Sequence, residues 1–200
     1  VDRTKTGRIF TGCEKGIYLT EDGAKSWRQV FATTDTVNDI QQSPHDPAHW
    51  LAVTQSAGAL ESRDGGRTWD VENTPLTRGT VAGLTGMAFK DSQMGMLVAA
   101  DINRLRTDSS TAVVGITTDA GRTWELRTRP PLPGALVGVA WVPGVGRETA
   151  VVTSYGGAFV TSDGARSWRT LTNALTTGVS AVGTRAWIVG GTGKIMRLDW

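Results

Sequence analysis

The chain has 200 residues, a formal net charge of +2 and a single cysteine, Cys13. The charge is too small to indicate binding to nucleic acid or to an acidic membrane, and one cysteine excludes an intrachain disulfide. No apolar stretch reaches the roughly 18 residues that cross a bilayer as a helix. Because the chain begins at Val1 rather than Met, we expect that upstream residues were removed or left out.

Short apolar runs rich in β-branched residues, broken by Gly, Pro, Asn and Asp, predict strands along the whole chain. The first unit, 1–32, is expected to hold three, at Arg8–Cys13, Gly16–Thr20 and Arg28–Phe31. Unit 33–72 has four, at Val37–Gln41, Trp50–Thr54, Ala59–Ser62 and Trp69–Val71. Unit 80–128 has four, at Leu84–Phe89, Gly95–Ala100, Val113–Thr117 and Trp124–Arg127. Unit 134–172 has four, at Leu136–Trp141, Thr149–Thr153, Ala158–Thr161 and Arg169–Leu171.

A nine-residue pattern occurs once in each of these four units, as LTEDGAKSW, ESRDGGRTW, ITTDAGRTW and VTSDGARSW. In each copy a Ser or Thr stands two residues before an Asp, two small residues follow, and Trp ends the pattern. Such residues suit a tight turn, because Asp accepts hydrogen bonds from the amides beyond it and Gly tolerates positive φ. The Trp that follows the turn is expected to lie in the sheet again, with its large apolar side chain packed in the core. The structural residues predicted here are Thr20, Asp22, Trp27, Ser62, Asp64, Trp69, Thr117, Asp119, Trp124, Thr161, Asp163 and Trp168.

The pattern resembles the Asp-box (BNR) repeat, which in that family is the turn between the third and fourth strands of a β-propeller blade. The resemblance implies an all-β chain, residues 1–200, built of four-stranded antiparallel blades around one axis. A fifth unit, 177–200, has strands at Val179–Val182, Ala186–Val189 and Lys194–Leu198. Gly193 precedes Asp199 by six residues, as Gly157 precedes Asp163, so a fifth box is expected to begin there. About five blades are therefore visible, either as a five-bladed ring or, as we favour, as part of a ring of about six to eight blades.

No catalytic, cofactor or metal site is predicted. Four similar aspartates spread around a ring do not converge on one point, and calcium requires about six to eight oxygen ligands. His45 and His49 have a spacing that suits a metal only on a helix, whereas the prolines around them predict a solvated hairpin tip.

Asp-box propellers include sialidases, so a glycoside hydrolase or carbohydrate-binding propeller is the alternative. Sialidase chemistry requires a tyrosine nucleophile, and the only tyrosines, Tyr18 and Tyr155, lie in no recognisable catalytic motif of that family. A carbohydrate groove would also expose tryptophans together. We expect Trp50, Trp141 and Trp187 to be packed between blades instead.

The spacing between box tryptophans is 42, 55 and 44 residues, and the excess lies in 101–112, between the second and third strands of the third blade. That loop is expected on the face opposite the box turns, beside the inter-blade segments 73–80 and 128–134. Long loops in compact domains are often functional. Arg104 and Arg106 are therefore the candidate partner-binding residues.

The stretch Ala186–Leu198, AWIVGGTGKIMRL, is similar to the repeated strand pair of the photosystem II stability/assembly factor family. These are non-enzymatic Asp-box propellers outside the cytoplasm that help to assemble photosynthetic membrane complexes. The resemblance implies a non-catalytic protein-binding platform, an extracytoplasmic location, and a protein partner in a membrane complex. No cofactor and no nucleic-acid partner is expected.

Overall fold

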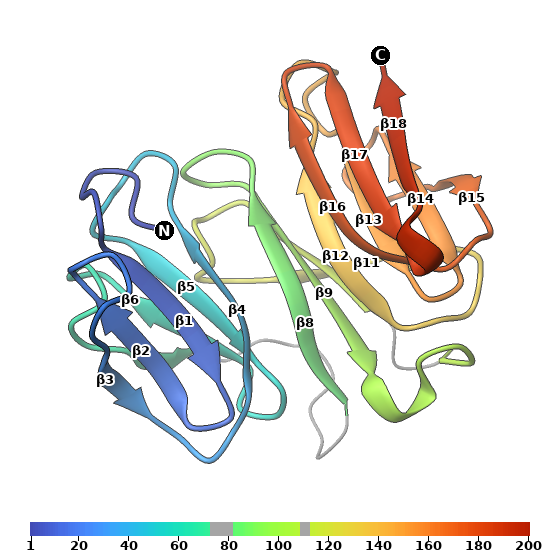
Figure 1. Cartoon of the computed structure of the whole chain (residues 1–200). Coiled ribbons are helices and arrows are strands. Elements are labelled where there is room, and N and C mark those ends of the chain that lie inside the picture. The colour runs from blue at the N-terminus through green and yellow to red at the C-terminus, as the bar shows by residue number, and fades with distance from the viewer. Residues whose placement is uncertain (73–81, 109–112) are drawn as a thin grey trace.

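The fold is described from a computed structural model, in which the described residues are 1–72, 82–108 and 113–200. Within these ranges, 18 strands form five antiparallel sheets that follow one another in an arc (Figure 1). Two short 3-10 turns, Ile102–Arg104 and Gly191–Gly193, interrupt the strands. No helix in the described ranges is long and apolar enough to cross a membrane.

Each sheet is a meander of consecutive strands. The first contains β1 (Ile9–Cys13), β2 (Gly16–Thr20) and β3 (Arg28–Ala32). The second contains β4 (Val37–Gln42), β5 (Trp50–Thr54), β6 (Ala59–Ser62) and β7 (Asp70–Glu72). The third contains β8 (Ala82–Phe89), β9 (Gly95–Asp101), β10 (Val113–Thr117) and β11 (Glu125–Arg127). The fourth contains β12 (Leu136–Trp141), β13 (Ala150–Ser154), β14 (Gly157–Thr161) and β15 (Arg169–Thr172), and the fifth contains β16 (Thr176–Val182), β17 (Arg185–Gly190) and β18 (Ile195–Asp199).

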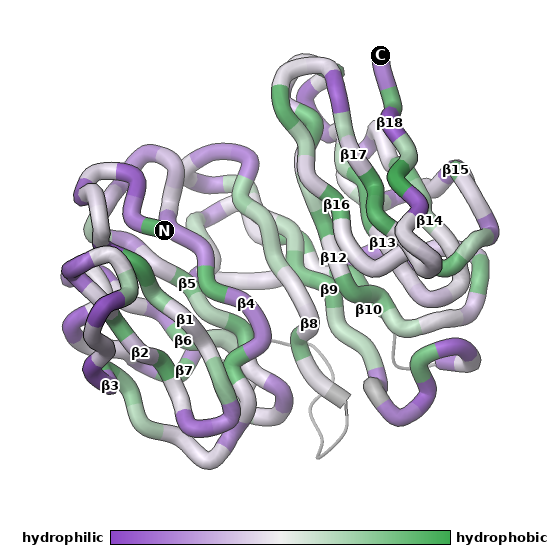
Figure 2. The backbone as a smooth tube through the Cα atoms, in the orientation of Figure 1, coloured by the Kyte–Doolittle hydropathy of each residue, from purple (hydrophilic) through white to green (hydrophobic). Residues whose placement is uncertain are grey.

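The core lies between neighbouring sheets. The central strands β5, β13 and β14 are buried along their whole length, because both of their faces are covered. One cluster joins Ile17 of the first sheet to Trp50 of the second, and others join the second to the third, the third to the fourth and the fourth to the fifth. Figure 2 shows hydrophobic residues concentrated on inner strands such as β9 and β12, with hydrophilic residues at many of the turns. This arrangement confirms the prediction of an all-β chain of antiparallel propeller blades.

The innermost strands of the last four sheets, β4, β8, β12 and β16, share an irregularity. Each has a register shift at one residue, and these residues are Asn38, Thr85, Val137 and Thr177. A β-bulge increases the local twist of a strand. The four bulges occupy one register position, so they bend the inner strands alike as these succeed one another around the axis.

The fifth sheet corrects the expected position of its box. Leu198 faces Ala186 in the fifth sheet, as Thr161 faces Ala150 in the fourth. The turn Gly191–Gly193 is one residue longer than the turn before β14, so the six-residue spacing from Gly193 is misleading. A leucine therefore stands where the other boxes place a hydroxyl, and Asp199 is out of register with Asp163.

Candidate interaction surface

The four box turns are held by their own side chains. In the fourth blade, the Thr161 hydroxyl donates to Asp163 Oδ1 (2.7 Å) and accepts from the Ala165 amide (2.9 Å). The Ser167 amide donates to Asp163 Oδ1 (2.9 Å), and the Ser167 hydroxyl donates to Asp163 Oδ2 (2.6 Å). Equivalent bonds surround Asp22, Asp64 and Asp119.

These hydrogen bonds lower the pKa of all four box aspartates. The Ser167 hydroxyl is the main cause at Asp163, whose pKa falls to about 2. The equivalent hydroxyl is also the main cause of the lowered pKa of Asp22 and of Asp64. Burial raises the pKa of Asp119, but the hydroxyl and amide of the closing threonine outweigh this effect and lower it. The four carboxylates are ionised and engaged within their own turns, which is a structural use of these groups.

Two consecutive residues with positive φ form each turn: Gly23 and Ala24, Gly65 and Gly66, Ala120 and Gly121, Gly164 and Ala165. The amide of the first residue of each pair donates to a carbonyl in a loop of the same blade, before β1 in the first blade and before the second strand in the other three. The acceptors are Gly7, Ala48, Gln93 and Glu148, at 2.8–3.2 Å. Each box turn therefore fixes the neighbouring loop. We name the surface formed by turns 21–26, 63–68, 118–123 and 162–167 the box-turn face.

The box tryptophans have different environments. Trp69 and Trp124 are each 8% exposed and Trp168 is half-buried, because each packs against the preceding sheet. Trp27 is 42% exposed. Its blade has no preceding sheet among the described residues, so the expected apolar packing does not hold at this position.

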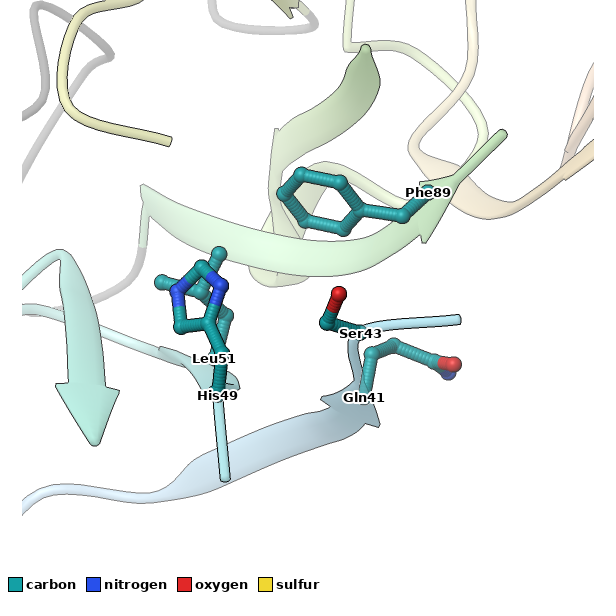
Figure 3. Close-up of a pocket in the computed structure, with 5 residues that line it drawn as sticks. All are labelled: Gln41, Ser43, His49, Leu51 and Phe89. Atoms are coloured by element: carbon teal, nitrogen blue, oxygen red, sulfur yellow. The ribbon is translucent and has the colours of Figure 1, made fainter. Parts of the chain in front are cut away.

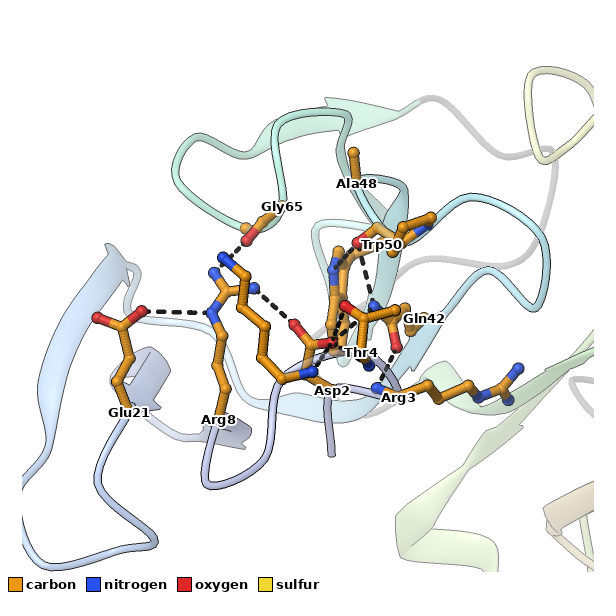
Figure 4. A network of polar contacts seen from close by, with 12 residues as sticks. Asp2, Arg3, Thr4, Arg8, Glu21, Gln42, Ala48, Trp50 and Gly65 are labelled. Carbon is orange, nitrogen blue, oxygen red and sulfur yellow. Dashed lines mark hydrogen bonds and ion pairs between the residues drawn. The ribbon is translucent and has the colours of Figure 1, made fainter.

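A polar network joins the first two blades on the box-turn face (Figure 4). Arg8 is buried, and its Nη1 donates to Asp2 Oδ2 (2.8 Å) while Nη2 donates to the carbonyl of Gly65 in the second box turn. Its guanidinium also lies 4.9 Å from the centre of the Phe10 ring. Burial acts to raise the pKa of Asp2, but hydrogen bonds from Arg8 and its other donors lower the pKa well below the usual range.

The prediction of a solvated hairpin tip holds for His45, which is exposed, and is wrong for His49. His49 is 5% exposed, and its Nε2 lies 2.8 Å from Oε1 of the buried Glu61 on the neighbouring strand. Figure 3 shows His49 and Leu51 in a small cavity between the second and third sheets, with Phe89 on the opposite side. The carboxylate partner is supplied by strand pairing, which the local sequence around the histidine does not reveal.

The residues expected for the glycosidase and carbohydrate alternatives do not converge. Trp50 and Trp141 are buried in the second and fourth sheets, as expected for packing, and the half-buried Trp187 lies in the fifth sheet. Tyr18 is in the first sheet, whereas Tyr155 lies at the turn before β14 in the fourth. Among the described residues, no group of three His, Cys, Asp or Glu side chains could hold a metal ion.

The loop after β9 lies on the opposite face, where Figure 1 shows its 3-10 turn beyond the end of β9. The loop is pinned to the segment between the third and fourth blades: the Ala135 amide donates to the Leu105 carbonyl, and the Gly134 amide donates to the Asp108 carbonyl, both at 2.8 Å. The predicted neighbourhood of 101–108 and 128–134 is therefore present, whereas 109–112 and the predicted segment 73–80 lie outside the described residues. We name the surface formed by 102–108, 128–135 and 155–156 the loop face.

Arg104 and Arg106 are both exposed on this loop. Neither side chain is in an ion pair with another described residue, in contrast to Arg63 and Arg166, whose guanidiniums contact Glu61 and Glu148. The backbone beside them is fixed, because the amides of Thr107 and Asp108 both donate to the Arg104 carbonyl. Two cations on a fixed loop can contact carboxylates of a partner without first breaking an internal ion pair.

Bulged inner strands and box turns on successive sheets define the chain as an Asp-box β-propeller. Residues 19–197 match the family model described as "Photosynthesis system II assembly factor YCF48". The chain belongs to this family.

Individual relatives support the same classification. The chain is 26% identical over 150 residues to the chloroplastic photosystem II stability/assembly factor HCF136 of Oryza sativa subsp. japonica, covering 72% of this chain and 33% of that protein. It is similar in structure to a solved "YCF48 bound to D1 peptide" (TM-score 0.62, 16% identity, 96% of this chain and 59% of that one). It is also similar to the GH74 enzyme of Niastella koreensis (TM-score 0.76, 14% identity, 100% and 35%). At these identities the two solved structures show the fold alone. The chain spans about a third of the length of the rice protein.

Proposed function

We propose that the chain is a non-catalytic propeller whose loop face binds a segment of a protein partner in a photosynthetic membrane complex. The family match carries this proposal, because it covers residues 19–197 and the family is described as an assembly factor. A similar solved structure, "YCF48 bound to D1 peptide", supports a peptide segment of a protein as the kind of partner.

On this proposal Arg104 and Arg106 contact the partner. The support is their exposure, the absence of an internal ion pair among the described residues and the fixed backbone of 101–108. Binding by two exposed cations is sensitive to ionic strength, because salt screens such charges over about 8–10 Å. The segment 128–134 lies beside them and extends the same surface.

We further propose that residues 1–200 act as one propeller domain, that the chain is not an enzyme, and that the protein works outside the cytoplasm. The engaged box aspartates support the second statement, because no acid of the boxes is left to transfer a proton. The chloroplastic relative is consistent with the third. Fold likeness to a GH74 enzyme carries no activity across 14% identity.

The test is a binding measurement with a labelled D1 peptide, followed by capture of partners from solubilised photosynthetic membranes. We expect Arg104→Ala combined with Arg106→Ala to weaken peptide binding at least about tenfold, the loss expected for two charge-assisted contacts. The matched control is Arg67→Ala combined with Arg122→Ala, which removes two exposed cations from the box-turn face. Equal loss in both double variants, or hydrolysis of a glycan that depends on one carboxylate, would contradict the proposal.

A further inference from the structure

A cavity of about 280 Å³ lies along the propeller axis. Its lining comes from the innermost strands of four consecutive sheets, β4, β8, β12 and β16, which Figure 1 shows side by side around the centre of the arc. The residues that matter for its chemistry are Asn38, Asp39, Gln41, Thr85, Met87 and Gly138.

The walls of this cavity are rich in backbone polar groups. Each of the four innermost strands pairs with a neighbour on one side only, in the described part of the chain. The other edge therefore carries N–H and C=O groups that no strand takes up. At Met87 such an amide donates to Asp39 Oδ2 (3.2 Å), across the boundary between the second and third sheets. Side chains already donate to two carbonyls on these strands, those of Leu84 and Leu136. A carbonyl oxygen has two lone pairs, so such carbonyls can accept a further hydrogen bond from a ligand.

Asp39 is the one ionisable side chain among the residues that line the cavity. The residue that follows the bulge is Asp39 in β4 but Gly86, Gly138 and Gly178 in the other three strands. Three of the four innermost strands thus form the bulge with no side chain at this position. Of these four strands, only β4 carries a carboxylate there.

Among the described residues, the carboxylate accepts hydrogen bonds from neutral donors and forms no ion pair with a cation. The Ile40 amide donates to Oδ1 (2.8 Å), and the Gln41 amide group donates to both oxygens (3.2 and 3.4 Å). Burial is nevertheless the main influence on this group and raises the pKa of Asp39 above its ordinary value. A positive group in the cavity would supply the missing compensation.

We propose that the cavity binds a primary ammonium group, with the Asp39 carboxylate as its counter-ion. An ammonium has three N–H donors, which match one carboxylate together with carbonyls on the inner strand edges. A calcium ion would require about six to eight oxygen ligands, and one carboxylate in a neutral cavity is a poor set. Asp39 is the third residue of β4. The site therefore lies toward the end of the cavity at which β4 begins.

The proposal is independent of partner binding at Arg104 and Arg106. Its probes are n-butylammonium and an N-acetyl-lysine methylamide, titrated into the full chain while the Ile40 and Met87 amide resonances are followed by NMR. Both amides donate to Asp39, so they report on the carboxylate directly. We expect saturable shifts for both probes at constant ionic strength, and none for the neutral analogue n-butanol. Tighter binding of the capped lysine would assign the ligand to a partner side chain, whereas tighter binding of n-butylammonium would assign it to a free amine.

Two variants separate charge from shape. Asp39→Asn keeps the size of the side chain and removes the charge, and Asp39→Gly reproduces the other three blades. We expect each to weaken binding at least tenfold. In the parent chain, saturating n-butylammonium should lower the pKa of the Asp39 carboxyl, followed by its own carbon resonance, so the test does not depend on how well the variants fold. Unsaturable shifts, shifts that survive in both variants, or an unchanged Asp39 titration would overturn the proposal.

Discussion

The indole of Trp69 lies edge-on to the ring of Phe10, with ring centres 6.2 Å apart and planes at 78°, although the two residues belong to neighbouring sheets. Trp69 closes the box turn of the second blade, and Phe10 is on β1 of the first blade. A motif that is local in sequence therefore provides a contact between blades. Trp124 has the same relation to the cluster that contains Leu51.

The first prediction follows from the difference in packing between Trp69, which is buried, and Trp27, which is exposed. Trp69→Ala is expected to lower the free energy of unfolding by about 3–5 kcal/mol, because it removes a buried aromatic side chain and leaves a cavity. Trp27→Ala is the matched control, since the same motif residue is 42% exposed there, and its cost is expected to be below about 1 kcal/mol. Urea unfolding measures both. Equal costs would show that the tryptophan acts within its own turn rather than between blades.

The second prediction concerns acid. The pKa of Asp163 is about 2 in the folded chain, below the unfolded value of about 3.9. Its contribution to stability is therefore complete above about pH 4 and is lost as the pH falls toward 2. Asp163→Asn is expected to cost about 1 kcal/mol at pH 7, after allowance for solvent screening, and progressively less below pH 4.

Urea unfolding at several pH values measures this gap between parent and variant. The exposed Asp70, whose side chain is in no ion pair with a described residue, provides the control Asp70→Asn. A gap that stays constant from pH 7 to pH 2 would contradict a role for the ionised carboxylate.

The sequence predicted those features that depend on neighbouring residues. The box turns are of this kind, because Asp163 binds groups within four residues of itself. Features that depend on partners distant in the chain were missed. The environment of His49 is set by Glu61 across a strand pair, and the exposure of Trp27 is set by what lies before its sheet.

The bulges were missed for a different reason. Their residues are Asn38, Thr85, Val137 and Thr177, which share no side-chain chemistry that a pattern could detect. What they share is a position on the innermost strand of a curved sheet. The cavity beside Asp39 is lined by residues at this common position. Predicting it would require the pairing register of the strands, which the sequence does not provide.

The third prediction uses the left-handed backbone of the box turns. Ala24 has φ 75° and is exposed, whereas Gly66 occupies the same position in the second box. Ala24→Gly is expected to stabilise the chain by about 0.5 kcal/mol, because relief of left-handed strain of about 1 kcal/mol exceeds the added entropy of the unfolded glycine. Gly66→Ala should do the opposite and cost more, since its Cβ would lie 2.3 Å from Cζ of Phe10. Thermal unfolding of the two variants decides the sign, and destabilisation by Ala24→Gly would refute the strain argument.

The fourth prediction tests the contact between inner strands. The Thr85 hydroxyl, at the bulge of β8, donates to the carbonyl of Leu136 in the next sheet (2.6 Å). Thr85→Val keeps the shape of the side chain and removes this donor, and a valine, Val137, already occupies the equivalent position of β12. We expect a loss of about 1 kcal/mol, the usual net value of one hydrogen bond, with a further penalty if the carbonyl is left without a partner.

Thr177 provides the control for that fourth change, because it has the same bulge position in β16 and is exposed. Thr177→Val removes an identical hydroxyl and is expected to change stability by less than about 0.5 kcal/mol, as is usual at surface positions. Amide hydrogen exchange adds a local measurement. If Thr85 joins two blades, Thr85→Val should speed exchange in both β8 and β12, whereas a hydroxyl that stabilises only its own strand would affect β8 alone.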